Sequence, residues 1–379
     1  MSILTTRIYS IRKYALNYLK TLSIITFCYV ITTSCMSNKN YKGELAYFTD
    51  NEEATDLLSS TTIKIDSLYY SPYIKVVDSI AIFYNYKEKN AFELVDLSTG
   101  KRIGSFCPIG QGHEEFIGLS PISQIYQEKN EKKTVLFAPN ECKMLIWNIS
   151  ESLKLKRTVY EDAIAYSWKN KTPVAYCNQT LIGKDSVLLS LPSIHISSED
   201  KITLPGYQIR TLKSNELISE INIFNHTVDN KDSRVMPENF YGAFCSVKPD
   251  RSKFAEAMTW LPQINVVDIK TGKIAGCRMK DTQDESVFST NMESALFCYK
   301  SIASDNHYIY ALWIGVSKNE LQPDMESYTV HVFDWDGQFV QKIKLEHPIN
   351  ELTISSENGF LYGWNLHQQI LYQYDLTFI

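Results

Sequence analysis

The feature that most constrains the fold is a hairpin pattern that recurs along the chain. Residues 92–106 (FELVDLSTGKRIGSF) and 264–277 (INVVDIKTGKIAGC) share alternating apolar residues, an Asp, and a Gly four positions after it. Residues 330–345 (VHVFDWDGQFVQKIKL) repeat the form with one residue fewer in the turn. Alternation predicts strands, and Asp followed by Gly predicts a tight turn, because glycine readily takes a positive-φ position. The pattern therefore predicts β-hairpins.

Degenerate copies of this hairpin extend over most of the chain. They begin at Met144 and Tyr207, and a truncated copy begins at Ile370. The turn-opening residue of each copy gives a set of equivalent points. Their spacings are 52, 63, 57, 66 and 41 residues, measured between Asp96, Asn148, Thr211, Asp268, Asp334 and Asp375.

A second hairpin precedes the first in each unit. It is clearest at residues 73–85, 244–258, 299–313 and 352–364, each with two apolar strands around a polar turn. Two hairpins give four antiparallel strands per unit, and six such units predict an all-β, six-bladed β-propeller. A pair of β-sandwiches or a seven-unit ring is the alternative, since the second and third copies are weak.

The last unit ends after its third strand, at the end of the sequence. A full ring would therefore lack one outer strand. Residues 60–66 (STTIKID) are β-prone and precede the first unit. We expect this N-terminal strand to complete the last blade and close the ring.

The N-terminal residues are typical of an export signal. Residues 1–20 hold four basic residues and no acidic residue, and the apolar run 22–31 is about ten residues long, where a membrane span needs roughly 20. The small residues 32–34 then precede Cys35. This order resembles the lipobox of bacterial lipoproteins, with Thr32 where Leu is usual. An ordinary signal peptide, or an N-terminal anchor with a coincidental cysteine, is the alternative.

The lipobox resemblance implies cleavage before Cys35 and lipid attachment to its thiol. We then expect residues 1–34 to be the signal peptide, 35–59 a tether and 60–379 the propeller. Two or three acyl chains on Cys35 would give stable membrane anchoring. The residues after Cys35 lack a dense acidic run, which favours the periplasmic face of the outer membrane over the cell surface.

The charge of the chain argues against nucleic acid as a partner. The net charge is −5, and it becomes −9 when the four basic residues of 1–34 are removed. Phosphate binding needs a clustered basic surface, and the densest run of basic residues here lies within NEKK at 130–133. We expect a monomer that meets the membrane only through its anchor.

The combined pattern resembles a known family. The blades, the element SVKPDRSKFAEAM at 246–258, the connection GQGHEEF at 110–116 and the N-terminus together are similar to the TolB-like six-bladed propeller lipoproteins of Bacteroidetes. The resemblance implies an architecture and a cell-envelope location, not a reaction. Family members usually read Gly-x-Gly-Pro-Gly-Glu-Phe at this connection, so His113 and Glu114 predict a local change of its shape.

Few residues suggest catalysis. The motifs of zinc proteases, serine hydrolases and phosphate-binding loops are missing from the sequence. His113, Glu114 and Glu115 could bind a metal or act as an acid–base pair, although solvated turn residues are the more common case. The acidic loops 228–234 and 280–286 could hold calcium, yet neither has EF-hand spacing. We therefore expect no cofactor, with a divalent metal such as calcium as the exception.

The cysteines and aromatic residues suggest mainly core positions. Six cysteines beyond Cys35 would allow 15 pairings, but their wide spacing and apolar contexts favour buried free thiols over disulfides. Trp147, Trp313, Tyr362 and Trp364 alternate along strands as core residues do. The candidate binding residues are those expected to be exposed in loops: Gly110, Gly112, His113, Glu114, Trp260 and Trp335.

Three functions are compatible with these features. The first is a non-catalytic binding or scaffold propeller that holds a glycan, a peptide or a partner protein. The second is an enzyme, such as a metal-assisted hydrolase, lactonase or lyase, because propellers often gather carboxylates and histidines around the channel. The third is a structural part of an envelope or nutrient-uptake assembly. The lack of catalytic motifs favours the first.

Overall fold

The chain divides into two compact units, residues 1–41 and 42–379. The predicted signal peptide, residues 1–34, and the predicted lipid-attachment residue Cys35 lie outside the described residues, so the fold below concerns the second unit. None of the helices among the described residues has the length and apolar character needed to cross a membrane. The computed structural model describes residues 40–50, 55–66, 71–165, 179–191, 194–196, 201–203, 206–225, 227–229, 241–287, 294–322, 324–355 and 359–377.

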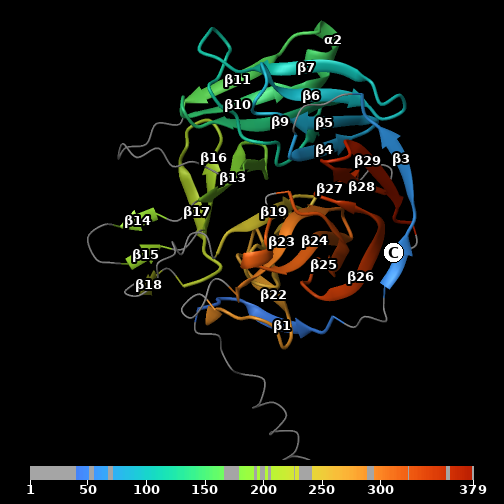
Figure 1. Ribbon diagram of the computed structural model, residues 1–379. Helices are drawn as coiled ribbons and strands as arrows, with labels where there is room; N and C mark the ends of the chain where they lie inside the picture. The colour runs from blue at the N-terminus through green and yellow to red at the C-terminus, as the bar shows by residue number, and fades with distance from the viewer. Residues whose placement is uncertain are drawn as a thin grey trace, which may run out of the picture. The chain divides into compact units, whose positions relative to one another are not determined.

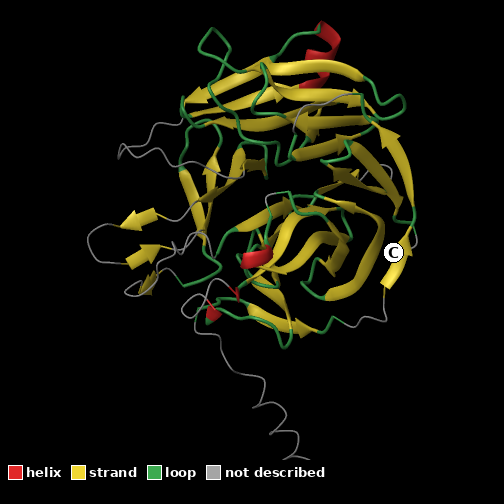
Figure 2. Ribbon diagram, viewed as in Figure 1, coloured by secondary structure: helices red, strands yellow, loops and turns green. Residues whose placement is uncertain are grey.

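The second unit is a six-bladed, all-β propeller (Figures 1 and 2), which confirms the predicted fold class. Blades 1, 2 and 3 each have four antiparallel strands. The strands of blades 1 to 3 are β4 (Tyr73–Val77), β5 (Ile80–Tyr84), β6 (Asn90–Asp96) and β7 (Arg102–Pro108); β8 (Tyr126–Glu128), β9 (Glu131–Ala138), β10 (Lys143–Asn148) and β11 (Tyr160–Ala165); and β12 (Gln179–Leu181), β13 (Ser186–Leu191), β16 (Gly206–Thr211) and β17 (Leu217–Ile221). A small three-stranded sheet is formed by β14 (Ile194–Ile196) and β15 (Lys201–Thr203), which come between β13 and β16 in the chain, and by β18 (Thr227–Asp229), which follows β17.

Blades 4, 5 and 6 each include a strand from the N-terminal part of the second unit. Blades 4 and 5 thereby have five strands, and blade 6 has four. The three N-terminal strands are β1 (Glu44–Phe48), β2 (Thr55–Leu58) and β3 (Ser60–Lys64). The other strands are β19 (Ala243–Val247), β20 (Lys253–Met258), β21 (Gln263–Asp268) and β22 (Ile274–Met279); β23 (Leu296–Ser304), β24 (Tyr308–Ser317), β25 (Ser327–Asp334) and β26 (Phe339–Ile349); and β27 (Glu351–Ser355), β28 (Phe360–Asn365) and β29 (Ile370–Asp375).

The hairpin turns have the geometry that the repeat predicts. The Asp96 carboxylate accepts a 2.9 Å hydrogen bond from the Thr99 amide, and Gly100 follows at φ +69°. In blade 4, Asp268 accepts from the Thr271 amide at 2.7 Å, and Gly272 again has φ +69°. A Cβ atom on Gly100 would lie 2.0 Å from the Lys64 carbonyl oxygen. Glycine is therefore required there both by its conformation and by its close neighbour.

Blade 2 departs from the predicted hairpin. The copy that begins at Met144 holds a helix, α2 (Ile149–Leu155), in place of the turn between β10 and β11. Asn148, which aligns with the turn-opening Asp of other copies, is the N-cap of α2 and accepts a hydrogen bond from the Glu151 amide at 2.9 Å. The same side-chain chemistry that opens a turn therefore caps a helix here.

The strand β3 closes the ring as the sequence predicts. It pairs antiparallel with β29, with Lys64 opposite Ile370 and Ser60 opposite Tyr374. A strand from the N-terminal part of the unit therefore completes the blade formed by the last three strands of the chain. Figure 1 shows β3 at the edge of the blade that β28 and β29 belong to, near the C-terminus.

The prediction of a tether over residues 35–59 is wrong for its described C-terminal part. β1 pairs parallel with β22 and β2 pairs parallel with β26, each as a fifth strand on the outer edge of its blade. Parallel pairing needs no hairpin turn between neighbours, so the turn pattern that revealed the other strands is absent. We call β1, β2 and β3 together the N-terminal belt.

The N-terminal belt is packed as well as paired. The Phe48 ring stacks on Phe339 with a centroid distance of 4.3 Å and an interplanar angle of 12°. Leu58 is buried in the apolar cluster of blades 5 and 6. The Ser60 amide donates to the Glu346 carboxylate at 2.9 Å. Backbone pairing, apolar burial and a polar contact therefore hold the belt to successive blades.

The apolar core lies between neighbouring blades. Trp364 of blade 6 packs edge-on against Phe83 of blade 1 at 4.8 Å, and Trp147 of blade 2 stacks on Phe92 of blade 1 at 5.0 Å. These tryptophans and Tyr362 are buried, as predicted, whereas Trp313 is only half-buried. Large aromatic rings therefore fill the space between blades 6 and 1 and between blades 1 and 2.

We expect Phe48→Ala to lower the free energy of unfolding by about 3 kcal/mol, because it removes a buried, stacked ring from the N-terminal belt. The neighbouring Tyr47 is 58% exposed on the same strand, so Tyr47→Ala should change stability by less than about 0.5 kcal/mol. Urea unfolding of both variants measures the difference. Equal losses in the two variants would show that belt packing does not stabilise the ring.

Candidate functional site

The predicted binding loop is an exposed turn held by its own residues. The Gly112 amide donates to the Glu115 carboxylate at 2.9 Å. A Cβ on Gly110 would lie 2.0 Å from an oxygen of that carboxylate, so Glu115 folds back over the glycines. His113 and Glu114 are exposed, and Glu114 takes a positive φ of 61°. His113 and Glu114 therefore lie at the tip of a self-supporting turn.

The structure does not bring the six predicted site residues together. The turns after the first and third strands of a blade lie on one face of the ring, which we call the first face. All other connections lie on the opposite, second face, because successive strands are antiparallel. Residues 110–114 and Trp260 share the second face but belong to blades 1 and 4. Trp335 follows the third strand of blade 5 and lies on the first face.

The expected exposure of the two tryptophans is only partly correct. Trp335 is 5% exposed, and its indole Nε1 donates to the Asp305 carbonyl at 2.9 Å, so its prediction as an exposed binding residue is wrong. The apolar ring is buried against blade 4 while its one donor is satisfied. Trp260 is half-buried and packs edge-on against Phe297 at 5.3 Å.

A cavity of about 240 Å³ opens where the first strands of five blades converge on the first face. The first strands contact one another around the channel, β19 with β23, β23 with β27, and β27 with β4. We call this cavity the channel mouth. Its lining residues are Lys75, Val76, Val77, Asp78, Ser123, Gln124, Ile125, Tyr126, Gln127, Lys132, Ser246, Val247, Pro249, Arg251, Ala303, Ser304, Thr353, Ile354 and Ser355.

The channel mouth is cationic although the chain as a whole is acidic. Its charged lining residues are three cations, Lys75, Lys132 and Arg251, and one carboxylate, Asp78. Lys132 pairs with Asp78 at 3.1 Å across blades 1 and 2. Among the described residues, neither Lys75 nor Arg251 forms an ion pair. Two basic side chains therefore line the cavity without an ion-pair partner in the described part of the chain.

Arg251 reaches across the channel mouth from blade 4. It lies in the turn between β19 and β20 with a positive φ of 63°. Its guanidinium carbon lies 5.6 Å from the centroid of the Tyr126 ring in blade 2. Such a cation–π contact stabilises the side chain over an aromatic face without neutralising its charge.

A buried carboxyl group lies in the same first strands as the channel mouth. Glu351, at the start of β27, is 9% exposed and accepts a hydrogen bond from the Ser301 hydroxyl. Burial raises the pKa of Glu351 to about 7, against the opposing effects of that hydrogen bond and of Lys75 and Lys300. A carboxyl group with this pKa could exchange a proton near neutral pH.

A second buried carboxyl group is part of a chain of hydrogen bonds through blade 4. Glu256 accepts from the Tyr207 hydroxyl of blade 3 at 2.6 Å and from Asn265 at 2.7 Å. The chain continues through Gln263 to Arg278, which pairs with Glu285 at 2.5 Å. Burial raises the pKa of Glu256 to about 7. These contacts join blades 3 and 4.

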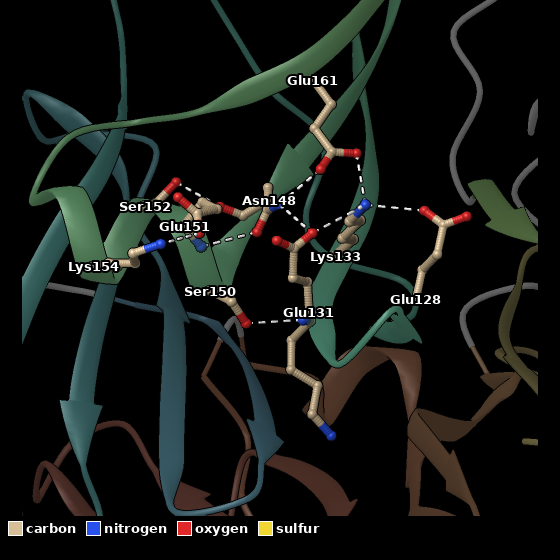
Figure 3. Close-up of polar contacts among 10 residues, drawn as sticks. Glu128, Glu131, Lys133, Asn148, Ser150, Glu151, Ser152, Lys154 and Glu161 are labelled. Carbon is tan, nitrogen blue, oxygen red and sulfur yellow. Dashed lines mark hydrogen bonds and ion pairs between the residues drawn. The ribbon is translucent and has the colours of Figure 1, made fainter.

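Figure 3 shows a third polar cluster, around the buried Lys133 of blade 2. Its ammonium contacts Glu161 at 2.8 Å, Glu128 at 2.9 Å and Glu131 at 3.4 Å. Asn148 also donates to Glu131 and Glu161. Burial alone would lower the pKa of Lys133, but the bonds to Glu161 and Glu128 outweigh burial and raise it. A lysine that stays protonated is not a nucleophile, so Lys133 has a structural role. Because the cluster also holds Asn148, the N-cap of α2, it fixes the start of that helix.

The described residues contain no group of three His, Cys, Asp or Glu side chains placed to hold a metal ion. In the loop 280–286, Asp284 instead caps the Ser286 amide at 2.9 Å. Of the loop 228–234, residues 230–234 lie outside the described residues. Five cysteines are free thiols, namely Cys107, Cys142, Cys245, Cys277 and Cys298. Cys177 lies outside the described residues.

The sequence prediction missed the channel mouth. Its residues come from five hairpins spaced over about 280 positions, and each looks like an ordinary polar residue at the end of a strand. One signal was available: each first strand of blades 1, 4, 5 and 6 has a Lys, Ser or Thr among its last three residues, where a two-sided core strand would be apolar. Aligning the first strands would have shown this polarity.

The comparisons with known proteins agree with the fold. The family described as "TolB-like 6-blade propeller-like" matches residues 203–357 of the chain. A candidate exported protein of Bacteroides fragilis has a similar solved structure, with TM-score 0.51, 10% identity, and coverage of 84% of this chain and 88% of that one. A member of the DUF4221 family from Bacteroides vulgatus gives TM-score 0.48, 13% identity and coverage of 88% and 96%. The comparison with curated proteins finds no match.

The family match and the Bacteroides fragilis structure confirm the predicted resemblance to TolB-like six-bladed propellers. At 10% identity, the Bacteroides fragilis structure shows a shared fold and nothing of a shared ligand.

The raised pKa of Glu351 predicts a pH dependence of stability. The folded state prefers the protonated acid, so its stabilising contribution is complete below pH 4.5 and is lost as the pH rises through about 7. The free energy of unfolding of Glu351→Gln, relative to that of the native chain, should therefore rise by up to about 3 kcal/mol between pH 4.5 and 7.5. Urea unfolding across this range measures the gain. The exposed Glu216→Gln is the control, and parallel curves for native and Glu351→Gln chains would contradict the assignment.

Proposed function

We propose that the chain is an exported binding propeller that holds a ligand in the channel mouth without transforming it. The observation that carries the proposal is the channel mouth itself, a concave site to which five blades contribute and in which two cations lack ion-pair partners among the described residues. Ligand sites in proteins are typically concave, with a few convergent polar groups. A glycan, a peptide or a projecting side chain of a partner protein fits this description.

The location in the cell envelope is part of the same proposal. The lipobox-like sequence before Cys35 supports export and lipid anchoring, and the Bacteroides fragilis protein with a similar fold is itself described as a candidate exported protein. The outer membrane, on its periplasmic side, is the location that we propose. The protein would act there as a monomer.

Glu351 supports a second candidate function, an enzyme that uses acid–base chemistry. Its pKa of about 7 suits a group that gives and takes a proton, and a hydroxyl and two lysines lie nearby. Turnover of a bound ligand that is lost in Glu351→Gln, while binding persists, would favour this function over simple binding.

A thermal-shift screen of the full-length chain in detergent tests the binding function. Panels of glycans, short peptides and divalent metals cover the proposed ligands. We expect at least one glycan or peptide to raise the melting temperature in a concentration-dependent way, since a ligand that binds only the folded state stabilises it. A screen without any shift, together with crosslinking that captures no envelope protein, would refute the proposal.

Cys35→Ala tests the proposed anchor. We expect the native chain to enter the detergent phase in Triton X-114 partitioning and to incorporate labelled fatty acid, because acyl chains confer membrane affinity. The variant should stay in the aqueous phase and take up no label. Cys142→Ala, which alters a thiol within the propeller, serves as the control. Equal labelling of all three chains would exclude Cys35 as the attachment residue.

A further inference from the structure

We propose that the ligand of the channel mouth is a small acidic sugar, one that carries a carboxylate or a phosphate beside its hydroxyl groups. This inference rests on the proposed binding function and names the class of ligand. It is carried by three observations on the lining residues: the unpaired cations, the hydroxyl groups around them, and one buried amide oxygen without a partner.

The cations select the charge of the ligand. Lys75 and Arg251 face the cavity without ion-pair partners among the described residues, and the third cation is already paired with the only lining carboxylate. The chain around the site carries a net negative charge, so these cations are a local exception. An Arg guanidinium binds the two oxygens of a carboxylate or phosphate in parallel, and Lys adds a point charge.

The burial of Lys75 adds to this argument. Burial lowers its pKa, because a charged ammonium is disfavoured away from water, and Glu351 only partly offsets the effect. An anion in the channel mouth would add to the counter-charge that Glu351 supplies only in part. Anion binding and the charged form of Lys75 therefore stabilise each other.

The uncharged lining selects a hydroxylated ligand. Ser123, Ser246, Ser304, Thr353 and Ser355 place hydroxyl groups around the cavity, among eight apolar or aromatic lining residues. Ser246 and Ser304 are 2.8 Å apart and already share a hydrogen bond. Hydroxyl groups both donate and accept, so such a lining matches the hydroxyls of a sugar.

Gln124 provides the most specific indication. Its side-chain Oε1 is buried and has no hydrogen-bond partner. Gln124 lines the channel mouth, so a rotation of its side chain would present this oxygen to a ligand there. Buried polar groups in native proteins are nearly always satisfied, so an acceptor without a partner beside the cavity agrees with a ligand that brings a hydroxyl donor.

The size of the cavity limits the ligand. At about 240 Å³ the channel mouth is smaller than the 300–1,000 Å³ typical of sites for drug-sized ligands. One sugar unit, alone or at the end of a longer glycan, is therefore favoured over an extended chain. A peptide would have to present a single acidic side chain.

Calorimetric titration of the full-length chain in detergent tests the inference with three probes: glucuronate, glucose 6-phosphate and glucose. At least one acid should bind at least tenfold more tightly than glucose, and its binding should weaken as salt rises. The two acids differ in the anionic group, so their ratio shows whether carboxylate or phosphate is preferred. Glucose that binds as well as both acids would overturn the inference.

Variants locate the binding. Arg251→Gln and Lys75→Gln should each weaken the binding of the preferred acidic sugar about 10- to 100-fold, which is the usual effect of losing a hydrogen bond to a charged group. Lys273→Gln is the control, because Lys273 lies on the same face, is exposed and pairs only loosely with Glu44 at 3.7 Å. Gln124→Leu should weaken the binding of both acidic sugars and of glucose by a similar factor. Unchanged melting temperatures without ligand show that each variant is folded.

The outcomes separate this inference from the proposed function. Binding of a neutral glycan or a peptide, weakened by Gln124→Leu, with no binding of either acid, leaves the function standing and refutes the acidic sugar. Binding of an acid that Arg251→Gln and Lys75→Gln weaken no more than Lys273→Gln does also refutes it, since the acid then binds elsewhere. Failure of every ligand class in the wider screen refutes the proposed function itself.

Discussion

The pairing of β3 with β29 is the constraint on which the rest of the structure depends. A propeller without this pairing would leave blade 6 with three strands and an open edge. Because β3 comes from the N-terminal side of the ring and β29 from its C-terminal end, their five residue pairs convert a row of sheets into a circle. Each blade then has a neighbour on both sides, and the wedges between blades can be filled with aromatic side chains.

Ring closure also creates the channel mouth. Once the first strands of the blades meet around an axis, their inward-facing side chains can no longer be covered by another sheet. These positions must be polar or solvated, and in this chain they carry hydroxyls, two unpaired cations and a buried carboxyl group nearby. The electrostatic character of the site therefore arises from a few residues at the ends of strands, against the net charge of the whole chain.

Local chemistry made most of the fold predictable. Asp96 and Gly100 mark a turn whose geometry depends on residues four positions apart, and the sequence shows such a unit directly. The closing strand was predictable because the last unit is one strand short. The parallel strands β1 and β2 were not, since their partners lie more than 200 residues away and no turn joins them. The helix α2 was missed because Asn148 suits a turn and a helix cap equally.

The site was much less predictable than the fold. Glycines, a histidine and tryptophans stood out in the sequence, but Trp335 uses its ring for packing and residues 110–114 form a turn that supports itself. The channel mouth instead draws single residues such as Lys75, Gln124 and Arg251 from distant hairpins. Their convergence is a property of the closed ring, and no local pattern encodes it.

The order of strands in the N-terminal belt has a mechanical consequence. Residues 44–48, 55–58 and 60–64 attach in turn to blades 4, 5 and 6, so a pull on the chain before Glu44 loads β1 first and β2 next. The closing strand β3 bears tension only after both have detached. The two parallel strands β1 and β2 would therefore detach first under such a pull, and the pairing of β3 with β29 that closes the ring would be loaded last.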